Sequence, residues 1–138
     1  MITQTLTTSF KQELLQGIHV FGTDVFKLAL YTSSASLDAD TTAYTTTSEV
    51  ASGAGYTTAG KVLTGTTVTT GSGVAYVDFA DAIWTSAGFT AAGGLIYNSS
   101  KANRAVGVLD FGSDKTSSTT FTVTMPANAA TTALIRLT

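Results

Sequence analysis

Apolar and polar residues alternate with a period of two along most of the chain, which is the pattern of β-strands that bury one face. In the first such segment, Phe26, Leu28 and Leu30 alternate with side chains that are basic, small or amphipathic. A late segment alternates in the same way and ends at Pro126, which cannot donate a hydrogen bond to a neighbouring strand. We expect strands at 25–31, 62–69, 74–79, 83–85, 89–91, 94–97, 105–111, 119–125 and 132–137.

These short strands, separated by glycine-rich and polar turns, are typical of an antiparallel β-sandwich or jelly roll. The turn Thr70-Gly71-Ser72-Gly73 is expected to close a hairpin between two of them. No helical pattern alternates with the strands, so a parallel βαβ sheet is not expected. A length of 138 residues suits one domain, so the sequence predicts a single all-β sandwich domain over residues 1–138.

One short amphipathic helix is expected over residues 9–17, before the first strand. Ser9 is a candidate N-cap, and Gln12, three residues later, would complete a capping box. Phe10 and Leu14 form an apolar stripe, and a glycine ends the range as a natural helix stop. A helix of this length is marginal alone, so it must pack on the sandwich or on a neighbouring subunit.

A long polar stretch from residue 32 to residue 60 interrupts the strand pattern. Its few large side chains are Leu37, Tyr44, Val50 and Tyr56. Loops of this length in a small domain are often functional. We expect a helical turn near 38–44 and an exposed loop over 53–60. A loop tyrosine can anchor an interface, stack on a sugar or fold back onto its own domain.

The chain is poor in charge, with 12% charged residues and a formal net charge of −2, against roughly 25% charged residues in ordinary proteins. A weakly charged surface is easily desolvated, which suits either burial in an assembly or a secreted β domain. The seven basic residues are scattered, so we expect no nucleic-acid binding. No apolar run is long enough for a membrane span, and the first residues lack the pattern of a signal peptide.

Residues suited to catalysis are few. His19 is the only histidine and there is no cysteine, which rules out disulfides and zinc sites of ordinary composition. The sequence contains no G-x-S-x-G turn that would expose a nucleophilic serine. The carboxylate pairs Asp38/Asp40, Asp78/Asp81 and Asp110/Asp114 are interpreted as solvated side chains at strand ends, although the first pair has oxygen ligands suited to a cation such as Ca²⁺. We therefore expect no enzymatic activity and no cofactor.

Three segments carry a resemblance to a known group of proteins. They read LALYTSSASLDADTTAY over 28–44, SEVASGAGYTTAG over 48–60 and FTAAGGLIYNSSKANRAVGVLDFGSDKTSS over 89–118. Together with the closing alternating strand, they resemble small structural proteins of tailed bacteriophages. The resemblance extends over most of the chain, from about residue 10 to residue 138, and includes no catalytic motif.

This resemblance implies a component of the virion, with a capsid decoration (cement) protein as the first expectation. Proteins of that kind often have a jelly-roll-like sandwich and bind as small oligomers to the lattice of the major capsid protein on the capsid surface. The alternative is a tail, fiber or adaptor module that binds host-surface carbohydrate.

Short strands leave sheet edges that need protection, so a homodimer or homotrimer is expected. We predict that the contact surface includes one face of the helix and the long polar loop. The predicted interface residues are Phe10, Leu14, Tyr44, Val50 and Tyr56.

Overall fold

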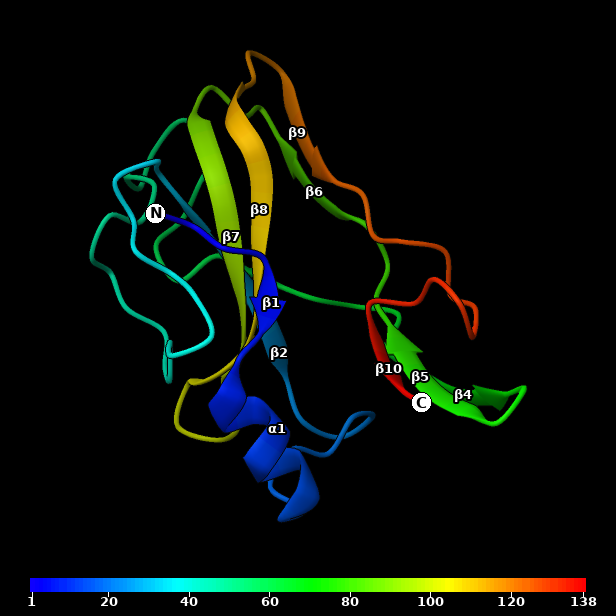
Figure 1. Ribbon diagram of the computed structural model, residues 1–138. Coiled ribbons are helices and arrows are strands. Elements are labelled where there is room, and N and C mark those ends of the chain that lie inside the picture. Colours follow the sequence, from blue (N-terminus) through cyan, green and yellow to red (C-terminus); the bar gives the residue numbers. More distant parts are fainter.

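A computed structural model describes all 138 residues, and Figure 1 shows how its strands are arranged. All strand pairs within the three sheets are antiparallel, and one short helix lies near the amino terminus, so the predicted all-β, sandwich-like fold is confirmed. The elements are β1 (Thr5–Leu6), α1 (Thr8–Leu15), β2 (Phe26–Tyr31), β3 (Lys61–Val62), β4 (Thr67–Gly71), β5 (Val74–Asp78), β6 (Ala82–Thr85), β7 (Thr90–Asn98), β8 (Arg104–Thr116), β9 (Thr120–Val123) and β10 (Ile135–Leu137). The helix is too short to cross a membrane.

The largest sheet has the strand order β1-β8-β7-β2-β3 and is built around the long β7–β8 hairpin (Figure 1). The two strands predicted at 89–91 and 94–97 form the single strand β7, with an irregularity in its pairing to β8 between Ala91 and Gly93. A β-bulge of this kind lets one strand continue past a break in its pattern.

Two smaller sheets complete the fold, with the orders β10-β5-β4 and β6-β9. The strand predicted at 62–69 is divided, because Gly65 has a positive φ of 68° that breaks the extended chain. The β4–β5 turn is also tighter than predicted. Only Ser72 and Gly73 lie between the strands, with φ values of 51° and 77°, which is typical of a two-residue hairpin turn.

Strand β2 is buried on both faces, whereas its sequence pattern predicts one apolar face. Phe26, Leu28 and Leu30 pack into the main core, and Ala29 and Tyr31 pack into a second, smaller core on the opposite face. The long polar segment between β2 and β3 covers that opposite face. It therefore acts as a wall of the domain, although it contains no helix or strand.

The helix starts earlier than predicted. Its N-cap is Thr7 and not Ser9, and the Oγ1 atom of Thr7 accepts a hydrogen bond from the backbone N–H of Phe10. Thr7 is fully buried, with its backbone N–H donating to the carbonyl of Val106 on β8. Packing against β8 thus selects which hydroxyl caps the helix. The helical turn expected at 38–44 is also wrong, since this stretch has a simple turn from Asp38 to Thr41.

Candidate interaction surface

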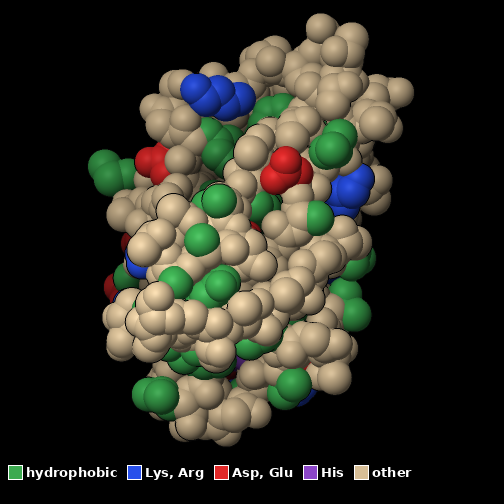
Figure 2. Space-filling model, turned by 90° about the vertical axis from the view of Figure 1, so that its right-hand side faces the viewer, with side chains coloured by type: hydrophobic (Ala, Val, Ile, Leu, Met, Phe, Trp, Pro, Cys, Tyr) green, Lys and Arg blue, Asp and Glu red, His purple; other side chains and the backbone are tan.

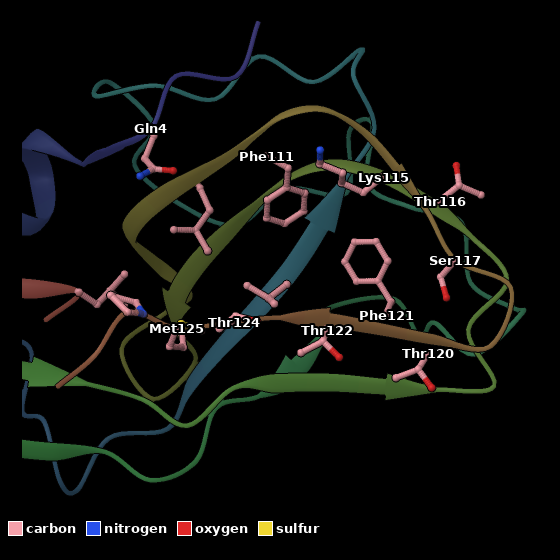
Figure 3. Close-up of a pocket in the computed structure, with 14 residues that line it drawn as sticks. Gln4, Phe111, Lys115, Thr116, Ser117, Thr120, Phe121, Thr122, Thr124 and Met125 are labelled. Carbon is pink, nitrogen blue, oxygen red and sulfur yellow. The ribbon is translucent and has the colours of Figure 1, made fainter. Parts of the chain in front are cut away.

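A groove of about 760 Å³ lies between the second half of β8 and strand β9 (Figure 3). Its volume falls within the range of sites that bind ligands. The residues that line it include Leu109, Phe111, Lys115, Phe121, Val123 and Met125. None of these was predicted as a site residue from the sequence.

Two free strand edges form the walls of this groove. Strand β9 pairs with β6 on one side only, and β1 covers β8 only at Gly107 and Val108. Past Val108, β8 pairs with no strand other than β7, and its other edge faces the groove, where the backbone N–H of Asp110 donates to Gln4 Oε1 at 3.2 Å. An unpaired edge exposes backbone N–H and C=O groups, and these are able to bind another strand.

The alternation of β9 separates the floor of the groove from its rim. Phe121, Val123 and Met125 point into the core and are buried, whereas Thr122 and Thr124 are exposed. The sequence places apolar residues at every second position here, and the strand geometry sends them to one face. The floor is therefore apolar and the rim carries hydroxyl groups.

Charge is almost absent from the groove. Lys115 is the only charged residue in its lining, and its Nζ atom donates to Ser113 Oγ at 3.0 Å. The segment from Thr116 to Met125 contains no charged residue at all. Edge strands in proteins are commonly protected by charged side chains or proline, and this edge lacks that protection along its length.

The predicted interface residues do not line this groove, and most of them are buried inside the protein. Phe10, Val50 and Tyr56 expose only 0%, 5% and 2% of their surface, so they cannot form a contact surface in this structure. The physical reason is that each fills the main core, where burial of a large apolar side chain contributes most to stability. Of the five, only Leu14 and Tyr44 are partly exposed.

The loop tyrosines fold back onto the half-buried carboxylate of Glu49, which is the hub of their hydrogen bonds. Its Oε1 atom accepts hydrogen bonds from Tyr56 Oη and the backbone N–H of Ala59, and its Oε2 atom accepts from Tyr44 Oη, each at 2.7 Å. The Tyr44 ring also stacks on Tyr97, with 4.8 Å between the ring centres. Burial and the Glu49 carboxylate raise the pKa of both Tyr44 and Tyr56. These side chains hold the loop in place.

Leu14 lines a small depression of about 130 Å³ formed entirely by hydrophobic residues. Phe21, Val68, Tyr76 and Leu137 are among its other lining residues, so α1, β4, β5 and β10 meet there. Figure 2 shows the face of the molecule that includes β4, β5 and β10, and charged side chains are few on it. This face is thus weakly charged and partly apolar.

His19 belongs to a closed polar cluster and not to an open site. Its Nδ1 atom lies 3.0 Å from Asn98 Nδ2, and its Nε2 atom lies 3.6 Å from Glu13 Oε2. Glu13 also accepts a hydrogen bond from Arg104 at 2.6 Å. Burial lowers the pKa of His19, against the opposing effect of Glu13 and Asp24. The cluster joins the helix and the segment after it to the β7–β8 turn.

The other end of this cluster is the ion pair between Asp24 and Lys101, at 2.8 Å. Burial raises the pKa of Asp24, but hydrogen bonds from Lys101, Asn98 and the backbone N–H of Val20 outweigh it and hold the pKa at about 2. Asp24 therefore stays ionised and has its hydrogen-bonding partners within the chain.

The carboxylate pairs considered from the sequence lie in separate local structures. Asp38 accepts a hydrogen bond from the backbone N–H of Asp40 in an exposed turn. Asp78 is buried and accepts from the N–H of Phe79, and Asp81 accepts from the N–H of Met125. No group of three or more potential ligand side chains is placed to hold a metal ion.

The weakly charged groove, with its free strand edges, is therefore the feature best suited to contact another molecule. The sequence contains one signal for it, the uncharged alternating segment that becomes β9. Comparison with models of known protein families, with curated proteins and with solved structures found no match for this chain.

Proposed function

We propose that this protein is a structural component of a tailed-phage virion, and specifically a capsid decoration protein that binds the lattice of the major capsid protein. The observation that carries the proposal is the weakly charged groove between the free edges of β8 and β9. Such a surface is cheap to desolvate and offers unpaired backbone groups to a protein partner. The resemblance of three sequence segments to small phage structural proteins supports the same assignment.

The stabilising mechanism would be thermodynamic linkage. A protein that binds the assembled shell and not its separated subunits stabilises the shell by its binding free energy. A bridge between neighbouring capsid subunits would then oppose the outward pressure of packaged DNA. No catalytic step is involved, and the contacts alone produce the effect.

A second candidate is a tail, fiber or adaptor module that binds host-surface carbohydrate. The half-exposed ring of Phe111 favours it, because this ring lies in the same groove as the hydroxyl groups of Ser117 and Thr120. Aromatic rings next to hydroxyl groups are suited to stacking on a sugar while binding its polar groups.

The copy number of the protein in virions of the phage that encodes it tests the assignment. Quantitative mass spectrometry of purified particles gives the ratio to the major capsid protein. A ratio near one to one, or a simple fraction of it, supports the decoration protein. A few copies per particle would instead support the tail module, which a glycan array would then examine. Absence from the particles would overturn both proposals.

A further inference from the structure

We infer that the groove between β8 and β9 accepts an extended segment of another protein, which binds as an added β-strand and places an acidic residue beside Lys115. This inference rests on the proposed function, because it assumes that the partner is a protein. It goes further by stating the conformation and the charge of the segment that binds.

The free edges favour an extended occupant. Every second residue of an edge strand directs its N–H and C=O groups away from its own sheet. The edge of β9 and its extension to Met125 provide about six residues, or about 20 Å of strand. A peptide in the extended conformation satisfies such groups along their length, which is the basis of strand addition in peptide recognition.

The division into floor and rim favours an alternating sequence in the occupant. Side chains of a bound strand point to opposite faces, so one set would contact the buried floor formed by Phe121, Val123 and Met125. The other set would lie level with the exposed hydroxyls of Thr122 and Thr124 and with solvent. The best occupant therefore alternates apolar and polar residues.

Charge complementarity defines one position of the occupant. Lys115 is exposed and is the only charged residue in the lining, and its ammonium group donates to the neutral hydroxyl of Ser113. No carboxylate lines the groove to neutralise it. An acidic residue in the bound segment would supply the missing partner.

A second copy of this chain fits these requirements less well. The edge strands β1, β3, β4, β6, β9 and β10 contain no acidic residue. The free edge of β8 carries Asp110 and Asp114, but this edge already forms one wall of the groove. The amino terminus is held by a hydrogen bond from Met1 to the carbonyl of Ala35. A segment of a different protein, such as an extended arm of a shell subunit, is therefore the favoured occupant.

The full-length protein can be tested with three synthetic nine-residue peptides. The first alternates threonine and valine around a central aspartate, the second has lysine in place of aspartate, and the third has proline at alternate positions. We expect the aspartate peptide to bind at least tenfold more tightly than the lysine peptide, and the proline peptide not to bind. Amide hydrogen exchange followed by NMR should show added protection at alternate residues of Thr120–Met125.

Two charge-reversal variants make the test specific. Lys115→Glu should weaken binding of the aspartate peptide at least tenfold and reverse the preference between aspartate and lysine. Lys11→Glu is the matched control, because Lys11 is exposed on α1 and lies outside the groove, so it should leave both affinities unchanged. Thr122→Asp adds a negative charge at the rim of the groove and should also weaken binding of the aspartate peptide.

The outcomes separate this inference from the proposed function. If the protein binds purified capsid shells but Lys115→Glu leaves that binding intact and no peptide protects the β9 edge, the strand-addition inference is wrong and the decoration function stands. Protection of the same edge by self-association alone would make a second copy the occupant and overturn the inference. Peptide binding without any binding to shells would instead overturn the decoration function.

Discussion

His19 and Asn98, which are 79 residues apart in the chain, meet in the core with 3.0 Å between the imidazole Nδ1 and the amide Nδ2 atoms. An amide nitrogen can only donate a hydrogen bond, so Nδ1 must accept and the ring proton is on Nε2. A second proton on the ring would convert this acceptor into a donor and break the contact. The neutral imidazole is therefore the form that the fold requires.

We expect the protein to lose stability as the pH falls below about 6.5. Burial lowers the pKa of His19 from 6.5, so between this value and the folded-state pKa the unfolded chain binds a proton that the folded chain does not. Acidification thus favours unfolding, by at most about 1.4 kcal/mol per pH unit for one proton. Urea unfolding between pH 7.5 and pH 4.5 measures this slope.

The control for this slope is His19→Gln, which keeps an acceptor for Asn98 but takes up no proton in that range. The difference between the two proteins also cancels the contribution of Asp78, whose pKa is raised by burial and which acts in the opposite direction. Equal pH slopes in the two proteins would contradict the assignment of His19.

Removal of the Glu49 carboxylate should destabilise the loop that covers the second core. Glu49→Ala leaves Tyr44, Tyr56 and the N–H of Ala59 without their acceptor, at a cost of about 2 kcal/mol in the free energy of unfolding. Glu49→Gln, which keeps one acceptor oxygen, should cost less. Denaturant unfolding measures both, and hydrogen exchange should show faster opening of residues 44–60. Equal losses of unfolding free energy for the two variants would contradict the role of Glu49 as the shared hydrogen-bond acceptor.

Phe10 should behave as a core residue in mutagenesis. Phe10→Ala is expected to reduce the free energy of unfolding by about 3–5 kcal/mol, because it creates a cavity at a fully buried position. Leu15→Ala, on the same helix but 90% exposed, is the matched control and should change stability by no more than about 0.5 kcal/mol. If thermal unfolding shows similar values for both variants, the helix does not pack as described.

The β4–β5 turn offers a stabilising substitution. Ser72 has a positive φ of 51°, and asparagine adopts this conformation more readily than serine. Ser72→Asn should therefore stabilise the protein by about 0.5 kcal/mol, and Ser72→Val should destabilise it, because β-branched residues disfavour positive φ. Thermal unfolding of the two variants should give shifts of opposite sign.

Self-association into a dimer or trimer is a further prediction. The uncharged outer strand β4 exposes 58% of Val68 beside the apolar depression around Leu14 and Leu137. Val68→Lys should convert an oligomer into a monomer while leaving the circular dichroism spectrum unchanged. Analytical ultracentrifugation of both proteins over a range of concentrations checks this. A wild-type protein that stays monomeric at high concentration would contradict the prediction.

Most of the fold follows from the sequence because period-two alternation is a local signal. Strands β2, β5 and β9 all lie where apolar residues recur at every second position. The sequence-based predictions are wrong where contacts between distant parts of the chain determine the local structure. Thr7 caps the helix in place of Ser9 because it is buried against β8, about a hundred residues later.

Three of the five predicted interface residues, Phe10, Val50 and Tyr56, are buried for the same physical reason. Large side chains in a polar loop are compatible with either a contact surface or a small core, and the sequence does not distinguish them. Tyr97 donates to the carbonyl of Ala59 and Tyr56 donates to Glu49, so the loop is fixed by contacts that no local pattern encodes. No local pattern predicts the groove, because Phe111 and Phe121 come together only when β8 and β9 are both in place.

The unprotected edge of β9 also affects the protein before it meets any partner. A strand without charge or proline is a template for edge-to-edge aggregation, and a net charge of −2 provides little repulsion between copies. Solubility should therefore limit the concentration at which the free protein can be stored. A partner that covers this edge would therefore also keep the protein in solution.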